Sequence, residues 1–180
     1  MSKKVLVIST SPRKGGNSDA LAEEFAKGAK EAGNEVEKIC LYDKTIGFCK
    51  GCFACQETKR CVIRDDADII AQKMKDVDVI AFVTPIYYFE MCGQMKTMLD
   101  RANPLYSADY RFRDVYMLTA AAEEGADTPE QAVHGLEGWI RCFPKARLAG
   151  TVFAGGADAI GDIEGNPALR EAFEMGKTVQ

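Results

Sequence analysis

Four closely spaced cysteines are the first residues of this sequence that could do chemistry. They follow the pattern C-x2-C-x2-C-x5-C and are Cys49, Cys52, Cys55 and Cys61. Thiolates two residues apart can wrap one face of an iron–sulfur cluster, as in the C-x2-C-x2-C-x3-C-P run of bacterial ferredoxins, although here the last gap is longer and no proline follows. On spacing alone, a four-iron four-sulfur cluster, a four-thiolate zinc site and a loop without metal all stay open.

The remaining cysteines and the single histidine follow no such pattern. Cys40, Cys92 and Cys142 stand within expected helices and strands, where buried cysteine is common, and His134 stands on an expected helix. We expect all four to be core or near-core residues without a chemical role.

A second group of residues suits the binding of a phosphate. Residues 9–18 read Ser-Thr-Ser-Pro-Arg-Lys-Gly-Gly-Asn-Ser and lead into a helical pattern. Free N–H groups at a helix N-terminus attract anions, and the two glycines allow the backbone a close approach. The segment is neither a P-loop nor a G-x-G-x-x-G fingerprint, so a monophosphate fits best. The alternative is a capping turn with Asn17 or Ser18 as N-cap and a solvated Arg13.

A third group of residues is aromatic. Residues 84–89 read Thr-Pro-Ile-Tyr-Tyr-Phe and follow the apolar run 79–83. The helical stretch after them is expected to contain Met91, Met95, Met98 and Leu99. Aromatic residues on loops usually serve packing, so these rings would form a cofactor shelf only if the fold places them beside the phosphate turn.

Five nearly continuous apolar runs alternate with segments of helical period, which is typical of parallel strands covered by helices on both faces. The runs are residues 4–9, 35–42, 78–84, 114–121 and 147–154. The second run is the most polar and is expected at a sheet edge. We predict an α/β fold with a doubly wound five-stranded parallel sheet in the order 2-1-3-4-5 and three α/β/α layers. That order places the turn after the first strand, residues 9–18, beside the turn after the third strand, residues 84–89.

Helical spacing and two start signals locate the later helices. The apolar residues at helical spacing are Ile70, Met74, Val77, Val133, Leu136, Ile140, Leu169 and Phe173. Residues 128–131, Thr-Pro-Glu-Gln, predict a capping box, and Asn166-Pro167 predicts a further helix start. Residues 43–65 show neither the helical nor the strand period. Long irregular loops in compact domains are usually functional.

The bulk properties limit the function class. The 180 residues carry a formal net charge of -4 and no Lys/Arg cluster on a helix face, which argues against nucleic acid as a partner. The N-terminal apolar run 5–8 is too short for a signal sequence or a membrane span. We expect a single domain over residues 1–180, no membrane association and a cytoplasmic location, where thiols stay reduced.

Taken in order, these motifs resemble the NADPH-dependent FMN reductase family and its iron–sulfur flavoprotein branch, over almost the whole chain. The resemblance rests on residues 11–18, residues 84–87, Lys96 with Asp100-Arg101, and the cysteine spacing. It implies a flavodoxin-like fold. Thr10 departs from the family pattern, which commonly has glycine there.

The resemblance also implies where FMN would bind. The phosphate would be held by Ser11, Arg13, Asn17 and Ser18, with Gly16 in the same turn. The isoalloxazine would be lined by Pro85, Ile86, Tyr87, Tyr88 and Phe89, and the site would be closed by Thr119 and Ala120.

The implied activity is that of an FMN-dependent NAD(P)H oxidoreductase, passing electrons from a nicotinamide nucleotide through bound FMN to a small-molecule or protein acceptor. Because the flavin carries the chemistry, no side-chain acid or base is expected. One alternative is an iron–sulfur flavoprotein electron carrier that relays single electrons between FMN, a four-iron four-sulfur cluster and a protein partner. Another is a flavin-less binding module. The family resemblance implies a homodimer or homotetramer.

Overall fold

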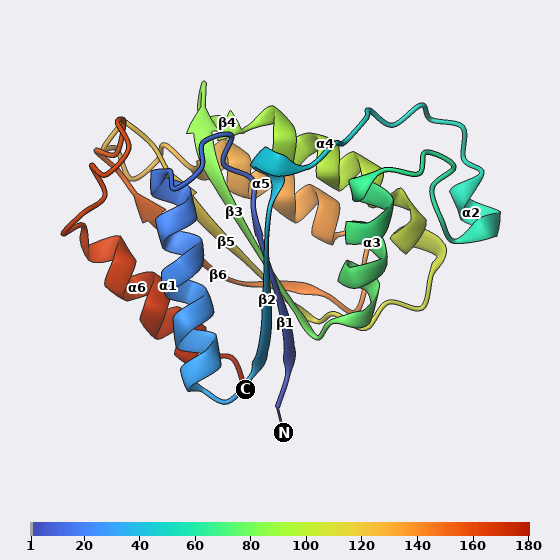
Figure 1. Cartoon of the computed structure of the whole chain (residues 1–180), viewed down its shortest axis with the longest axis horizontal. Helices are drawn as coiled ribbons and strands as arrows, with labels where there is room; N and C mark the ends of the chain where they lie inside the picture. Colours follow the sequence, from blue (N-terminus) through green and yellow to red (C-terminus); the bar gives the residue numbers. More distant parts are fainter. Residues whose placement is uncertain (1) are drawn as a thin grey trace.

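A computed structural model describes residues 2–180 and contains one sheet flanked by helices (Figure 1). The strands are β1 (Lys4–Ser9), β2 (Glu35–Cys40), β3 (Val79–Tyr87), β4 (Glu90–Met91), β5 (Asp114–Ala120) and β6 (Arg147–Ala154). The main helices are α1 (Asn17–Glu31), α3 (Asp66–Asp76), α4 (Gly93–Arg101), α5 (Glu130–Ile140) and α6 (Pro167–Lys177). Short helical turns are η1 (Leu41–Asp43), α2 (Cys55–Thr58) and η2 (Asn103–Ser107).

The sheet has the order β2-β1-β3-β5-β6, and all of these neighbouring strands pair in parallel. Counted without the short β4, this is the predicted order 2-1-3-4-5. The flavodoxin-like α/β prediction is therefore confirmed.

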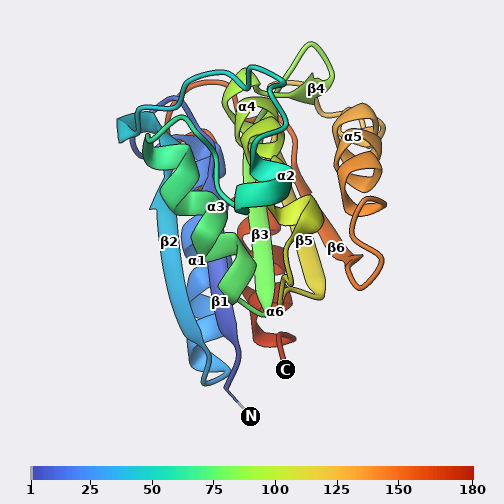
Figure 2. The same ribbon diagram turned by 90° about the vertical axis from the view of Figure 1, so that its right-hand side faces the viewer.

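Two hydrophobic clusters lie on opposite faces of the sheet. Alternate residues of β1 point into each, with Leu6 and Ile8 on one side and Val5 and Val7 on the other. The first cluster is covered by α3, α4 and α5, and the second by α1 and α6 (Figure 2). Burial on both faces explains why the central strands read as continuous apolar runs.

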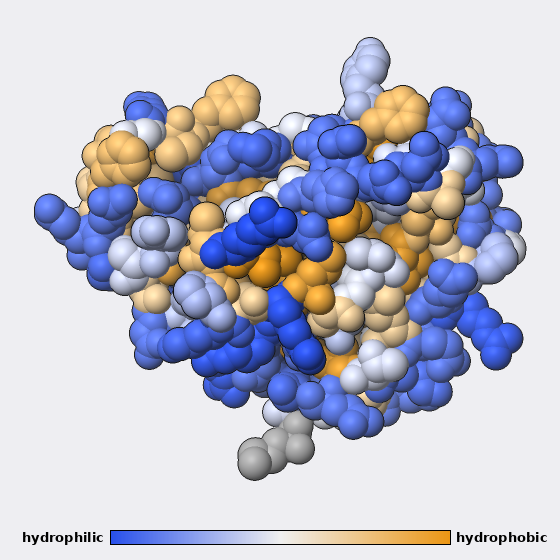
Figure 3. All heavy atoms as spheres, turned by 180° about the vertical axis from the view of Figure 1, so that it is seen from behind, coloured by the Kyte–Doolittle hydropathy of each residue, from blue (hydrophilic) through white to orange (hydrophobic). Residues whose placement is uncertain are grey.

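The sheet edges match the polarity of their strands. β2 alternates between exposed and more buried residues and lies at one edge, as its polar sequence predicts. β6 forms the other edge of the sheet. The view from behind shows hydrophobic residues gathered in the middle of that face and bordered by hydrophilic ones (Figure 3). No helix within residues 2–180 is both long and apolar enough to cross a membrane.

Two expectations for local structure need correction, and a third is confirmed. β3 continues past residue 84 to Tyr87 and turns back through β4, so Met91 lies in a strand and not in α4. The predicted capping box is wrong, because α5 begins at Glu130 without a side-chain cap and Thr128 is buried. Residues 43–65 do lack regular structure apart from the short α2.

The helix start at Asn166-Pro167 is confirmed. The Asn166 side chain accepts a hydrogen bond of 2.9 Å from the N–H of Ala168, and Pro167 opens α6. Of the four residues expected in or near the core, Cys92 is buried and Cys40 is half-buried. The expectation is wrong for the other two, because His134 within α5 and Cys142 just after it are exposed.

Helices α1 and α6 approach so closely that glycine is needed at their crossing. A Cβ at Gly28 would lie 2.0 Å from the carbonyl oxygen of Phe173, and a Cβ at Gly176 would lie 2.2 Å from that of Phe25. Backbone cannot move aside as a side-chain end can, so a methyl group at either position would push the helices apart.

We therefore expect Gly28→Ala to lower the free energy of unfolding by about 1–3 kcal/mol, because overpacking outweighs the better helix propensity of alanine. The matched control is Gly138→Ala in α5, where a new Cβ would meet nothing within 4 Å. That variant should gain up to about 1 kcal/mol. Urea unfolding measures both, and a stabilised Gly28→Ala variant would contradict the close crossing.

Candidate functional site

A solvent-open cavity of about 140 Å³ lies where the turns after β1, β3, β5 and β6 meet. Nine of the predicted site residues line it: Ser11, Arg13, Gly16, Asn17, Ser18, Pro85, Ile86, Tyr87 and Ala120. Four further lining residues were not predicted: Ala121, Ala122, Ala157 and Asp158. The strand order thus brings together residues that are up to 147 positions apart, from Ser11 to Asp158, at the carboxyl edge of the sheet.

The N-terminus of α1 offers unpaired donors to this cavity. The first backbone hydrogen bond of the helix runs from the N–H of Ala20 to the carbonyl of Gly16, at 3.1 Å. Within residues 2–180, the N–H groups of Asn17, Ser18 and Asp19 have no acceptor. Together with the positive end of the helix dipole, these donors suit an anion.

Glycine at position 16 lets the turn fold tightly beside these donors. A Cβ there would lie 2.8 Å from the Oγ atom of Ser11, and that hydroxyl donates to the carbonyl of Arg13 at 2.9 Å. Any side chain at position 16 would therefore displace the Ser11 hydroxyl from the cavity wall.

Two predicted phosphate ligands also hold the loop after β6. The Nη1 of Arg13 donates to the carbonyl of Asp158 at 2.9 Å, and the Nδ2 of Asn17 donates to that of Ala159 at 2.8 Å. The N–H of Gly161 donates back to the Oδ1 of Asn17 at 3.1 Å. The N–H of Ala157 also donates to the carbonyl of Ala121 at 2.8 Å. Residues 155–161 were not predicted to belong to the site, and these contacts place the loop in the cavity wall.

Three predicted site residues do not line the cavity. Thr119 is buried within the sheet, where its hydroxyl donates to the carbonyl of Val152 at 3.3 Å. Tyr88 and Phe89 form the turn between β3 and β4, with exposed fractions of 100% and 52%. Tyr87, which does line the cavity, is the residue just before them.

The turn at Tyr88 and Phe89 has a strained backbone. Their φ angles are 52° and 64°, a left-handed conformation that a tight hairpin requires and that glycine or asparagine normally supplies. Bulky residues in this conformation cluster at functional sites, where the strain is retained for a reason other than stability. Both residues directly follow Tyr87, so their hairpin lies at the edge of the cavity.

Thr10, the departure from the family pattern, points away from the cavity. Its Oγ1 donates to the carbonyl of Val83 at 3.1 Å and lies 3.3 Å from the sulfur of Cys92, and all three residues are buried. The Thr84 hydroxyl also lies 3.3 Å from that sulfur. Thr10 therefore links β1 to β3 beneath the turn and leaves the cavity open.

The four spaced cysteines line a second, smaller cavity at the C-terminal end of α4. It is lined by Cys49, Cys52, Cys55 and Cys61, together with Lys50, Phe53, Val62, Ile63, Asp100, Arg101, Asn103 and Pro104. Within residues 2–180, no three His, Cys, Asp or Glu side chains converge closely enough to bind one metal ion. The thiols thus surround a space and do not meet at a point.

Nitrogen donors already contact two of these sulfur atoms. The Nδ2 of Asn103 donates to the sulfur of Cys55 at 3.2 Å, and the N–H of Gly51 donates to that of Cys49 at 3.4 Å. Donors of this kind stabilise the negative charge of thiolate ligands and their metal centres. The donor set therefore fits an iron–sulfur cluster.

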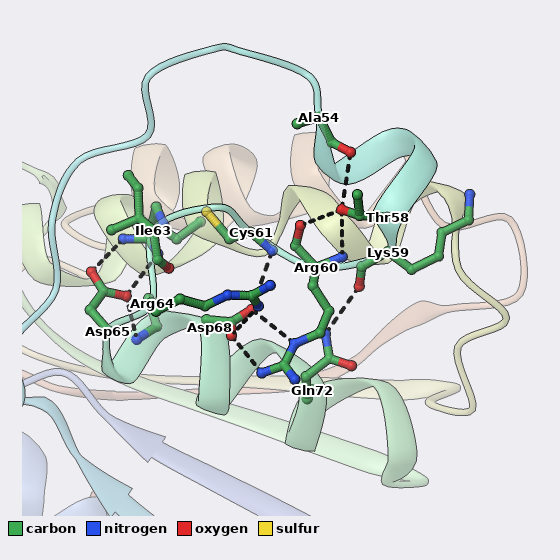
Figure 4. A network of polar contacts seen from close by, with 12 residues as sticks. Ala54, Thr58, Lys59, Arg60, Cys61, Ile63, Arg64, Asp65, Asp68 and Gln72 are labelled. Atoms are coloured by element: carbon green, nitrogen blue, oxygen red, sulfur yellow. Dashed lines mark hydrogen bonds and ion pairs between the residues drawn. The ribbon is translucent and has the colours of Figure 1, made fainter.

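The fourth cysteine is positioned by a buried carboxylate (Figure 4). Asp68 in α3 is 2% exposed and accepts the backbone N–H of Cys61 at 3.2 Å. It also accepts hydrogen bonds of 2.6 Å from Arg60 and 3.0 Å from Arg64. Burial acts to raise the pKa of Asp68, but the hydrogen bonds from Arg60 and Arg64 outweigh it and leave the pKa below its usual value.

A second carboxylate and a buried arginine fix the rest of the loop. Asp65 caps α3 and receives hydrogen bonds of 2.7 Å from both Nη1 and Nη2 of Arg101 in α4. The same guanidinium donates to the carbonyls of Gly47 at 2.6 Å and Ile63 at 3.0 Å. The cysteine loop is thereby tied to α3 and α4 by protein contacts alone.

Comparison with known proteins gives relatives along most of the chain. The family model of NADPH-dependent FMN reductases matches residues 3–158. An iron-sulfur flavoprotein of Methanocaldococcus jannaschii is 36% identical over 134 residues, 73% of this chain and 69% of that protein. An iron-sulfur flavoprotein of Methanosarcina thermophila is 29% identical over 175 residues, 96% of this chain and 87% of that protein.

A solved structure shares the fold at low sequence identity. An NAD(P)H:quinone oxidoreductase from Methanothermobacter marburgensis superposes with a TM-score of 0.76 at 17% identity, covering 100% of this chain and 97% of that one. This likeness supports the flavodoxin-like architecture.

Replacing Tyr88-Phe89 by Asn-Gly should relieve the strain of the hairpin turn. We expect the free energy of unfolding to rise by roughly 1–2 kcal/mol per position, the usual cost of a left-handed residue with a bulky side chain. The control is the Ala-Ala variant, which removes the rings but keeps the unfavourable φ angles. In urea unfolding, only the Asn-Gly variant should have a higher free energy of unfolding than the unaltered protein. If all three proteins have the same free energy of unfolding, the turn is unstrained.

Removing the carboxylate of Asp68 should release the segment around Cys61. In metal-free protein, we expect Asp68→Ala to make Arg60 and Arg64 much faster sites of trypsin cleavage, because the salt bridges and the Cys61 N–H contact are lost together. Asp76→Ala, at the exposed end of α3, is the control. If trypsin cuts both variants at the same sites and rates as the unaltered protein, Asp68 does not hold the loop.

Proposed function

Because this chain belongs to the NADPH-dependent FMN reductase family, we propose that it binds FMN and acts as an NAD(P)H-dependent oxidoreductase with a small-molecule or protein electron acceptor. The observation that carries this proposal is the cavity at the junction of β1 and β3. There the free N–H groups of α1 lie next to the turn that follows the neighbouring strand. Ligands of doubly wound sheets bind at this switch point.

The residues divide naturally between the two ends of FMN. The N–H groups of Asn17 and Ser18 and the hydroxyl of Ser11 would hold the phosphate, and Arg13 would add a positive charge beside it. Residues 85–87 and 120–122 form the opposite wall of the cavity and would contact the isoalloxazine. Bound FMN would supply the hydride and electron chemistry, and the protein would orient it.

The nicotinamide donor and the acceptor need access to the flavin, and the exposed hairpin at Tyr88 and Phe89 stands where either would enter. We infer that this hairpin contacts the second substrate or a second subunit, because it stands at the rim of the cavity without lining it. Among the residues that line the cavity, Asp158 carries a carboxylate, and the proposal gives it no proton-transfer role because bound FMN would carry the redox chemistry. The protein would orient the bound FMN and the nicotinamide donor and would exclude water from them.

A second function is favoured by the cysteine cavity. We infer that Cys49, Cys52, Cys55 and Cys61 hold a four-iron four-sulfur cluster, so that the protein relays single electrons between FMN, the cluster and a protein partner. In such a cluster each thiolate binds a different iron, which suits sulfurs spread around a space better than the single point that zinc requires. Rapid reduction by free NADPH or NADH would favour the first function, and slow reduction by both nucleotides would favour the second.

The oligomeric state and the cellular compartment are also proposed from the family. We propose a homodimer or homotetramer, in which the exposed aromatic residues near the two cavities are covered by a neighbouring copy. These residues are Phe48, Phe53, Tyr88 and Phe89. A reducing compartment such as the cytoplasm would keep the cysteines available as ligands.

The FMN proposal is tested by the affinity of the metal-free and flavin-free protein for FMN, measured by fluorescence quenching. Ser11→Ala and Gly16→Ala should each raise the dissociation constant about tenfold or more, because each removes or displaces a donor to a charged phosphate. Lys14→Ala, in the same turn but outside the cavity wall, should leave the constant unchanged. Equal affinities for all three variants would place FMN elsewhere.

A further inference from the structure

Arg101 is a buried cation in the wall of the cysteine cavity. Its side chain is 0% exposed, and it lines the same space as the four thiols. The carboxylate of Asp65 raises the pKa of Arg101 most, and the nearby sulfur of Cys61 raises it further. A buried positive charge thus lies in the wall of the cavity that the four thiols line.

The hydrogen bonds of this guanidinium leave one donor unused. A guanidinium has five N–H groups. The four on Nη1 and Nη2 are used by the two oxygens of Asp65 and the carbonyls of Gly47 and Ile63. The fifth, on Nε, is buried and has no partner among residues 2–180. Burying an unsatisfied donor is costly and calls for a reason.

The structural role of Arg101 does not supply that reason. The four terminal N–H groups alone tie Gly47, Ile63 and Asp65 together, and Nε contributes nothing to this contact. The contacts also fix the plane of the guanidinium, so that Nε cannot turn away to find another partner. Of the other acceptors that line this cavity, the Asp100 carboxylate is 49% exposed and pairs with Lys96 at 2.7 Å. The sulfur atoms of the four cysteines surround the same space as Arg101.

We propose that Arg101 sets the reduction potential of the metal centre held by the four cysteines, by donating its Nε–H to a sulfur of that centre and placing a fixed positive charge beside it. This rests on the proposed cluster. Reduction adds one electron to the centre and makes it more negative. A buried positive charge and an N–H donor stabilise the reduced form more than the oxidised form, so they raise the potential.

Asp65 opposes this effect because its carboxylate partly neutralises the guanidinium. It is held in place by the N–H groups of Gly47 at 2.8 Å and Ala67 at 3.1 Å, independently of Arg101. Asparagine at position 65 could keep an oxygen for these contacts while removing the negative charge. Arg101 and Asp65 should therefore shift the potential in opposite directions.

The test is an anaerobic redox titration of the iron-loaded, FMN-containing protein, followed by electron paramagnetic resonance of the cluster. In the double variant Arg101→Gln/Asp65→Asn, which keeps the buried pair neutral, we expect the equilibrium constant for reduction of the cluster to fall about tenfold or more. For a one-electron couple, tenfold corresponds to about 59 mV. The single variant Asp65→Asn should shift the potential upward.

The matched control is Arg147→Gln, which removes an arginine that is 77% exposed and pairs with Asp114 at 2.7 Å, away from the cysteine cavity. It should leave the potential unchanged, since solvent screens its charge. Iron content and FMN affinity, measured on the same samples, separate lost binding from a shifted potential.

Unchanged potentials in both Asp65→Asn and the double variant, with iron retained, would reduce Arg101 to a structural residue. If the double variant binds no iron, the sign of the shift in Asp65→Asn decides, and a downward or absent shift overturns the proposal. If the unaltered protein takes up no iron, the result contradicts both the proposed cluster and this role of Arg101. FMN binding at the β1–β3 junction is tested separately, by the FMN titration.

Discussion

The pairing of β1 with β3 is the contact on which the candidate FMN site depends. These strands are far apart in sequence, yet Ser9 lies opposite Val83, and the N–H of Thr10 extends the ladder to the carbonyl of Val83 at 2.8 Å. The turn with the free helix donors and the turn with Pro85 and Tyr87 therefore leave the sheet side by side. The Thr10 hydroxyl reinforces this junction from below.

The cysteine cavity depends on a different interaction, the burial of charge at the ends of α3 and α4. Asp65 and Asp68 lie one turn apart at the start of α3, and each holds a different part of the cysteine loop. Arg101, at the end of α4, closes the network. Because these contacts need no metal, the loop is already ordered around the space that a cluster would fill, which lowers the ordering cost of binding it.

The sequence was most informative where burial imposes a pattern. The five parallel strands and their order follow from apolar runs and crossover handedness. The turn proposed to bind phosphate was singled out by residue types that recur at helix N-termini. The hairpin at Tyr88 and Phe89 could not be predicted, because its backbone conformation contradicts the preference of its residues. The loop at Asp158 is recruited by side chains that are distant in sequence. Thr128 matched a capping pattern but is buried by tertiary packing.

The central claim is that this chain binds FMN and reduces it with a nicotinamide nucleotide. The most direct measurement is the anaerobic absorption spectrum of freshly purified protein, before and after addition of NADPH, with iron and acid-labile sulfide determined on the same sample. The account predicts flavin absorption bands that NADPH bleaches, over the broad absorption of an iron–sulfur cluster. Protein that shows no flavin bands and takes up no added FMN would contradict it.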